Sequence, residues 1–140
     1  MGKPRAGPAE LEGSVSDALL RFAVLRHEGI DQPHFDFLFE TAPGSMLQTW
    51  RLNAWPIMEA QEAQRIRDHR PAFLTYQGSL TGDRGHVVRV DEGTCLADVS
   101  ARRVVVDLSP SGQRLAFEAQ PEGETWLVRV EERPNTSPGA

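Results

Sequence analysis

The sequence has one cysteine, one lysine and no long apolar run. Because Cys95 is the only thiol, an internal disulfide is excluded, and a structural metal site built from several thiolates is not expected. No apolar stretch approaches the roughly 18 residues that a membrane-spanning helix needs. The N-terminus also lacks the apolar core of a signal peptide. We therefore expect a cytoplasmic protein that makes no contact with a membrane.

Excess positive charge is also missing, since the net charge is −5. A broad grip on duplex nucleic acid through its phosphates is therefore not expected, although one phosphate or a strand end could still bind. The arginines are unevenly distributed, and the two histidines in the middle of the chain lie among five of them. Such a cluster is either an ordinary solvated face or a local anion site. The five are Arg65, Arg67, Arg70, Arg84 and Arg89.

The pattern of apolar residues predicts one mainly β domain over residues 18–132. Residues 1–17 and 133–140 are rich in Gly, Pro and small polar residues without periodicity, and we expect them to be flexible tails. Between them, short strand-like segments are separated by turn residues, which is typical of an antiparallel barrel or sandwich. One segment, Ile57 to Arg67, is rich in Glu, Ala, Gln and Arg and predicts a short helix. The strands are expected over 20–27, 34–41, 46–52, 73–76, 86–90, 94–99, 103–108, 114–119 and 125–130.

The segment His34 to Glu40 alternates strictly between aromatic and mostly polar residues. As a strand it places three phenylalanines on one side, and His34, Asp36, Leu38 and Glu40 on the other. The pair His34 and Asp36 alone could be a hydrogen-bonded surface pair. His27 lies seven residues earlier across a Gly- and Pro-containing loop that could bring the two imidazoles together. Two imidazoles and one carboxylate then predict a divalent metal site with open positions, and Glu40 could orient a ligand or act as a base.

Two further positions could bind or protonate a phosphate. His69 follows the predicted helix among arginines, so it could stabilise a phosphoryl oxygen or donate a proton, or it could simply interact with the helix dipole. Arg84 lies in the tight loop Gly82–Gly85, where a guanidinium either contacts a phosphate or is only solvated. Trp55 could stack on a base, although core packing is the alternative.

Five ordered motifs resemble the 3′-phosphoesterase domain of bacterial DNA ligase D, which also occurs as small free-standing proteins. The resemblance covers about residues 20–96. It implies a compact β-barrel that uses a divalent metal, typically manganese, to remove 3′-terminal ribonucleotides and 3′-phosphates. The motifs are Arg21-Phe-Ala-Val-Leu-Arg-His27, His34-Phe-Asp-Phe-Leu-Phe-Glu40, Leu47-Gln-Thr-Trp50, Asp68-His-Arg-Pro-Ala-Phe-Leu-Thr-Tyr-Gln-Gly78 and Gly85-His-Val-Val-Arg-Val-Asp-Glu-Gly-Thr94.

The resemblance implies that the metal ligands are His27, His34 and Asp36. It also implies a phosphate-contacting histidine at His69 and a glutamate of the same strand face at Glu40. Two positions depart from the pattern: Leu38 stands where the family has an arginine, and Phe73 stands where it has a tyrosine. We expect Arg84 or Arg70 to replace the missing cation, and Tyr76 to replace the hydroxyl.

We therefore predict a compact antiparallel β-barrel with one short helix. Its expected function is metal-dependent phosphoesterase chemistry on nucleic-acid 3′ ends in DNA repair, with manganese or alternatively zinc as cofactor. We expect a monomer, with a DNA ligase or polymerase as candidate repair partners. One alternative is a non-catalytic relative that binds a metal or a nucleic-acid end, as the two departures suggest. Another is a structural barrel without metal.

Overall fold

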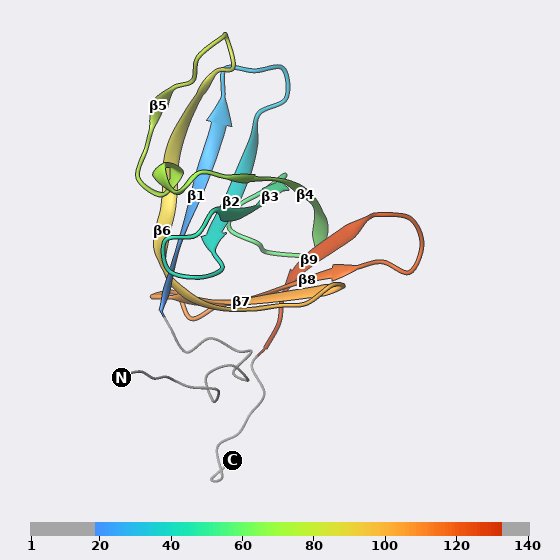
Figure 1. Ribbon diagram of the computed structural model, residues 1–140. Coiled ribbons are helices and arrows are strands. Elements are labelled where there is room, and N and C mark those ends of the chain that lie inside the picture. The colour runs from blue at the N-terminus through green and yellow to red at the C-terminus, as the bar shows by residue number, and fades with distance from the viewer. Residues whose placement is uncertain (1–18, 133–140) are drawn as a thin grey trace, which may run out of the picture.

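The computed structural model describes residues 19–132, and the tails expected at 1–17 and 133–140 lie outside the described residues. As predicted, the described chain is mainly β and forms an antiparallel β-barrel (Figure 1). Within residues 19–132 the only helical element is a single 3-10 turn, η1 (Pro71–Leu74). The strands are β1 (Leu20–Glu28), β2 (His34–Glu40), β3 (Leu47–Leu52), β4 (Gln61–His69), β5 (Gly78–Ser79), β6 (His86–Val99), β7 (Arg103–Ser109), β8 (Arg114–Ala119) and β9 (Trp126–Val130).

Eight of these strands close the barrel in the order β1-β2-β3-β4-β9-β8-β7-β6, because β6 also pairs with β1. The two-residue strand β5 pairs with the edge of β6 that faces away from β1, so it lies outside the closed barrel. β6 is long enough to pair with β1, β5 and β7 along different parts of its length. By contrast, β4 and β9 are joined by only three residue pairs. The pairing that closes the barrel is therefore shortest between β4 and β9.

The helix expected over Ile57–Arg67 is wrong, because residues 61–69 form strand β4. Glu, Ala, Gln and Arg favour a helix only weakly, and tertiary pairing overrides that preference. Here β4 fills the place between β3 and β9, where it hydrogen-bonds to both. Its Ala63 points into the barrel core, and Ile57 packs into the same core from the loop before the strand.

Two other strand predictions are also corrected. The segment 73–76 is not a strand, because η1 begins at Pro71 and ends at Leu74. The strands expected at 86–90 and 94–99 are one continuous strand, β6. Gly93, which lies between these two predicted strands, is inside β6, where a Cβ would lie 2.0 Å from the Ser109 carbonyl oxygen. Glycine is therefore needed here for the close approach of strands β6 and β7, and not for a turn.

Two hydrophobic clusters lie on opposite faces of strand β2. Phe37 and Phe39 point into the barrel and pack in the main core with Trp50 and Phe117. Leu38 points the other way and is fully buried in a second cluster on the outer face of the wall. That cluster is covered by η1 and the following segment, which lie outside β1 and β6 in Figure 1. The cluster consists of Ala23, Leu25, Leu38, Leu47, Leu74 and Val87.

Candidate metal centre

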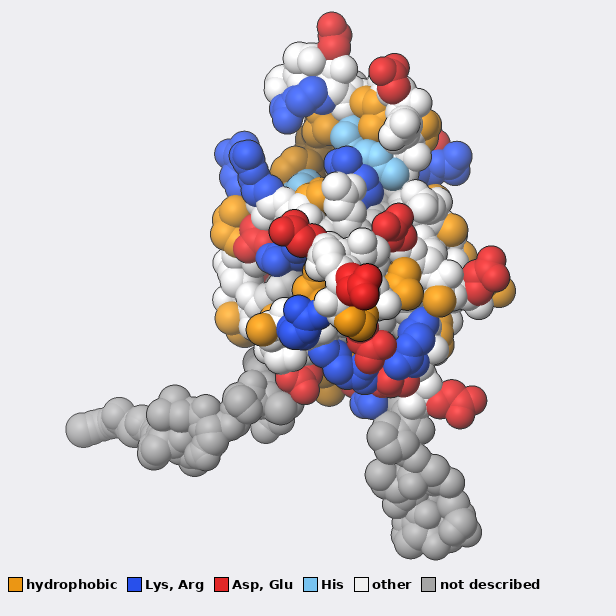
Figure 2. Space-filling view, turned by 90° about the vertical axis from the view of Figure 1, so that its right-hand side faces the viewer, with side chains coloured by type: hydrophobic (Ala, Val, Ile, Leu, Met, Phe, Trp, Pro, Cys, Tyr) orange, Lys and Arg blue, Asp and Glu red, His pale blue; other side chains and the backbone are white. Residues whose placement is uncertain are grey.

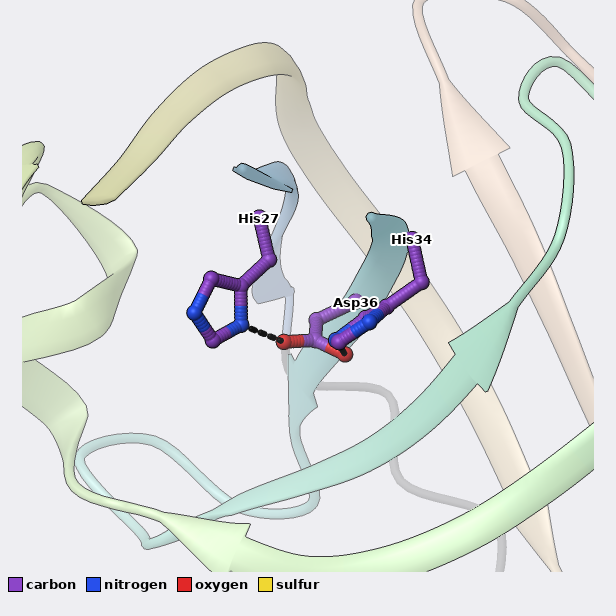
Figure 3. Close-up of side chains that lie close together, drawn as sticks. All are labelled: His27, His34 and Asp36. Atoms are coloured by element: carbon purple, nitrogen blue, oxygen red, sulfur yellow. Dashed lines mark ion pairs between the residues drawn. The ribbon is translucent and has the colours of Figure 1, made fainter. Parts of the chain in front are cut away.

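Three side chains of the kinds that can bind a metal converge at one end of the β1–β2 hairpin (Figure 3). His27, near the end of β1, lies directly opposite His34, the first residue of β2. Asp36 lies two residues further along β2 and therefore on the same face. One potential ligand atom from each residue lies within 4.8 Å of the other two. The geometry therefore brings together the three residues that the sequence predicts as metal ligands.

Hydrogen bonds to backbone carbonyls fix the tautomers of both imidazoles. His27 Nε2 lies 2.7 Å from the Arg84 carbonyl oxygen, and His34 Nδ1 lies 3.0 Å from the Gln32 carbonyl oxygen. Because a carbonyl only accepts, each of these nitrogens carries the proton. In the neutral rings the other nitrogens, His27 Nδ1 and His34 Nε2, are then free to bind a ligand, and both face Asp36. Orientation of a ligating histidine by a carbonyl on its second nitrogen is a common feature of metal sites.

The inward-facing atoms of the cluster lack hydrogen-bond partners. His34 Nε2 and Asp36 Oδ1 are 3.3 Å apart, both are buried, and neither is hydrogen-bonded within residues 19–132. His27 Nδ1 is 4.0 Å from Asp36 Oδ2. A lone pair of a neutral imidazole facing a carboxylate is unfavourable, and a buried polar atom without a partner costs about 1–3 kcal/mol. A divalent cation between these atoms would remove both costs, so the donor set fits a metal.

Arg51 is a cation beside this cluster that the sequence reasoning missed. It lies on β3 directly opposite Asp36, with Nε 3.9 Å from Asp36 Oδ1. This Nε is buried and also has no hydrogen-bond partner among the described residues. The signal was present, because the turn at 42–45 sets a register in which residue 51 faces residue 36. The resemblance led us to expect an arginine at position 38, where the chain has Leu38. Arg51, on the neighbouring strand, brings a guanidinium to the same part of the sheet.

A small hollow of about 430 Å³ connects the cluster with the other predicted phosphate-binding residues. Its volume lies in the range of small-molecule sites, about 300–1,000 Å³. Cationic and apolar side chains line it together, and His34 alone of the three ligands lies outside it, in a neighbouring hollow. The predicted residues that line it are His27, Asp36, His69, Arg70 and Arg84.

His69 ends strand β4 rather than a helix, which excludes the helix-dipole interpretation. Its Nδ1 donates to the Arg67 carbonyl oxygen at 3.0 Å, so Nε2 is the unprotonated nitrogen of the neutral ring. The ring lies edge-on to Phe73, with 5.2 Å between centroids. Phe73 therefore holds the imidazole by packing, in place of the hydroxyl contact expected from a tyrosine.

Arg84 contributes to the site through its backbone as well as its side chain. Its carbonyl orients His27, while its guanidinium donates to Thr81 through Nε at 2.7 Å and one terminal nitrogen at 2.8 Å. The next residue, Gly85, has φ +79°, and a Cβ there would lie 2.1 Å from the Glu28 carbonyl oxygen. Glycine is required for this loop to approach the end of β1 so closely.

Glu40 does not reach the cluster, which corrects its expected role. It lies at the opposite end of β2, where its carboxylate accepts the backbone N–H groups of Arg21 and Gly44, both within 2.9 Å. Arg21 also pairs with it through its side chain. Buried at 3% exposure, Glu40 holds the turn between β2 and β3. The alternation along β2 gave the correct face for Glu40 but not its distance from the histidines.

The other residues considered from the sequence have structural roles. The Tyr76 hydroxyl donates to the Ser79 carbonyl, and Tyr76 does not line either hollow at the cluster. Trp55 stacks on Phe37 in the core and donates its indole N–H to Asp91 at 3.0 Å, so core packing is the correct interpretation. Cys95 is buried in the barrel core, where burial raises its pKa to about 12, with Glu40 adding to the effect.

Comparison of the chain with known protein families gives no match, and comparison with curated proteins gives none either. Among residues 19–132 there is no helix of the length and apolarity that crossing a bilayer would require.

Proposed function

We propose that this protein is a divalent-metal-dependent phosphoesterase that acts on the 3′ ends of DNA or RNA, as a relative of the DNA ligase D phosphoesterase domain. The supporting observation is the convergence of His27, His34 and Asp36, with unpartnered buried ligand atoms, beside a cationic hollow. The reaction would remove a 3′-terminal ribonucleotide or a 3′-phosphate in DNA repair. Its proposed setting is the cytoplasm, with the protein acting as a monomer and a DNA ligase or polymerase as repair partners.

The three clustered residues would hold the ion, which we propose to be manganese, with zinc as the alternative. When bound, such an ion polarises a phosphoryl oxygen and lowers the pKa of a coordinated water. The protein contributes the orientation of the ligands, through the carbonyls of Arg84 and Gln32.

Cationic side chains around the hollow would bind the phosphate. Arg51 is already directed at the cluster from β3, and Arg70 and Arg84 line the other side. A guanidinium can donate two parallel hydrogen bonds to phosphate oxygens. His69, with its Nδ1 held by Arg67, would use Nε2 to stabilise developing charge or, when protonated, to donate a proton to the leaving oxygen.

A second candidate is a relative that binds a metal or a nucleic-acid end without turnover. It is favoured by Leu38, which is fully buried in the outer hydrophobic cluster, and by Phe73, which packs on His69. Neither side chain can supply the contact expected at its position. Losing one such charge-assisted contact in the transition state would lower the rate by roughly two orders of magnitude. Arg51 is the proposed replacement for the missing cation.

The test is to incubate the purified protein with manganese or zinc and a primer that carries a 3′-ribonucleotide or a 3′-phosphate. We expect product that is abolished by EDTA and by His34→Ala. His86→Ala is a matched control, because this partly exposed histidine pairs with Glu28 and lines neither hollow. Metal binding, measured by calorimetry on the same variants, separates the two candidates. Binding without cleavage across metals and pH would contradict the enzymatic proposal, and absence of both would contradict the metal site itself.

A further inference from the structure

A second, larger hollow of about 1230 Å³ begins at the same cluster and extends toward the β8–β9 hairpin. His27 and Arg51 line both hollows, so the two meet at the cluster. β4 pairs with β9 only through residues 61–63, and the hollow lies beside residues 62–65 of β4 and residues of the β8–β9 hairpin between 119 and 126. Figure 2 shows histidine side chains gathered high on the corresponding face of the molecule, with cationic side chains directly beside them.

The charges along this hollow suit a short anionic chain better than a duplex. Arg51, Arg65 and Arg102 line it, coming from β3, β4 and the turn before β7. The acidic residues Asp31, Glu62 and Glu124 line it too, so its charge is close to balanced in a chain of net charge −5. Arg65 is already paired with Asp68 at 2.8 Å, which leaves Arg51 and Arg102 to bind phosphates. Two spaced guanidiniums can bind a few phosphates, whereas a duplex requires a broad positive surface.

The hollow also contains an aromatic surface. Trp126, the first residue of β9, lines it and is only partly buried. Its indole lies edge-on to Trp50, with 5.0 Å between centroids, so it is held rigidly by the core. Proteins that bind single strands typically combine guanidiniums along the backbone with a fixed aromatic ring on which a base stacks.

We infer that the larger hollow is a binding groove for a single-stranded nucleic acid, whose last nucleotide enters the small hollow beyond the cluster. The small hollow suits a nucleoside, because apolar side chains such as Phe73, Leu80 and Met46 form much of its lining. This inference rests on the proposed function for the placement of the 3′ end, but the binding groove can be tested without catalysis.

The experiment measures binding of a fluorescent single-stranded oligonucleotide of about ten nucleotides by anisotropy, in buffer that contains EDTA. We expect Arg102→Ala to weaken binding several-fold, because among the described residues this exposed side chain makes a single hydrogen bond, to the Gln120 carbonyl oxygen. The slope of log affinity against log salt concentration should fall by about 0.7 for the lost phosphate contact. Arg21→Ala is the control, since Arg21 lies outside both hollows and should leave binding unchanged.

A second variant tests the stacking surface. Trp126→Phe keeps an aromatic ring against Trp50, so we expect it to fold, to bind the strand more weakly and to lose fluorescence quenching by the oligonucleotide. Equal affinity of wild type and Arg102→Ala, tighter binding of a duplex, or binding of an acidic peptide in place of the strand would overturn the groove. Arg102-dependent binding together with absent cleavage would overturn the phosphoesterase proposal and leave the groove intact.

Discussion

The barrel wall carries two clusters that each combine basic and acidic side chains. They differ in whether their polar atoms have hydrogen-bond partners. On β7, β8 and β9 and just after β9, Arg103 pairs with Glu118 and Glu131, and Arg129 contacts the same two carboxylates. Every charged group there faces an opposite charge. At the end of the β1–β2 hairpin, by contrast, His34 Nε2 and Asp36 Oδ1 face one another without a hydrogen bond.

The contrast distinguishes a stabilising network from a ligand site. In the Arg103 network the side-chain hydrogen bonds with Arg103 lower the pKa of Glu131, and those with Glu131 raise that of Arg103. The network is complete in itself and needs nothing from solution. The histidine cluster orients its free nitrogens by hydrogen bonds on their opposite sides, which costs stability unless a cation binds. We therefore expect changes in the first cluster to affect folding, and changes in the second to affect metal binding.

The largest expected effect is that of Asp36→Asn on metal affinity. The substitution removes the only carboxylate of the set and keeps its size, so we expect the affinity for manganese or zinc to fall at least about 100-fold. Metal at 100 times its dissociation constant should stabilise the wild type by about 2.7 kcal/mol and the variant far less. Calorimetry and metal-dependent thermal unfolding measure these effects. Equal stabilisation of both proteins would show that the ion binds elsewhere.

A smaller effect is expected from Gly85→Ala. The new Cβ would clash with the Glu28 carbonyl oxygen and push the Arg84 carbonyl away from His27. Loss of such a contact behind a ligand typically lowers metal affinity by about 10–100-fold. Gly82→Ala is the matched control, because Gly82 lies in the same loop with φ +70° but has no atom within 4 Å of its added Cβ. Similar affinities for the two variants would indicate that backbone strain, and not the close approach, matters.

Arg103→Ala should lower the stability of the fold and leave metal binding unchanged, the opposite of the two variants above. Partly exposed ion pairs contribute little individually, so we expect a loss of about 1 kcal/mol in the free energy of unfolding, with metal affinity unchanged. Urea denaturation measures the stability, and Arg102→Ala controls for loss of a neighbouring exposed arginine outside the network. A fall in metal affinity in Arg103→Ala would show that the two clusters are coupled.

The smallest effect is the pH dependence of that loss. Because Arg103 lowers the pKa of Glu131 in the folded protein, the stabilisation is fully present above the ordinary glutamate pKa of 4.5. It is lost as the pH falls through the lower pKa of the folded state. The stability difference between wild type and Arg103→Ala should therefore be constant near neutral pH and shrink in acid. Chemical denaturation at pH 7 and at several acidic pH values tests this, and a difference that grows in acid would contradict it.

The sequence alone predicted the structure correctly wherever the local pattern of residues and the tertiary structure favour the same element. The alternation from His34 to Glu40 predicted both the strand and its polar face, and the six residues between His27 and His34 allowed a hairpin. It failed for residues 61–67, where helix-forming composition lost to pairing with β3 and β9. It also failed at residues 91–93, where a break between two strands was expected, because a sequence does not distinguish a glycine needed for a positive φ from one needed for close approach, as Gly93 is.

The sequence by itself determined the barrel class and the three candidate ligands. It also placed His34 and Asp36 on one face, because a period of two puts alternate residues on the same side of a strand. Only the tertiary structure decided which distant groups complete the site. Strand register brought Arg51 opposite Asp36, and the close approach at Gly85 brought the Arg84 carbonyl to His27. The tertiary structure also places Leu38 in a second hydrophobic cluster, and it places Glu40 at the turn near Gly44, away from the histidines. These contacts span up to 57 residues and depend on how strands pair, which no local pattern encodes.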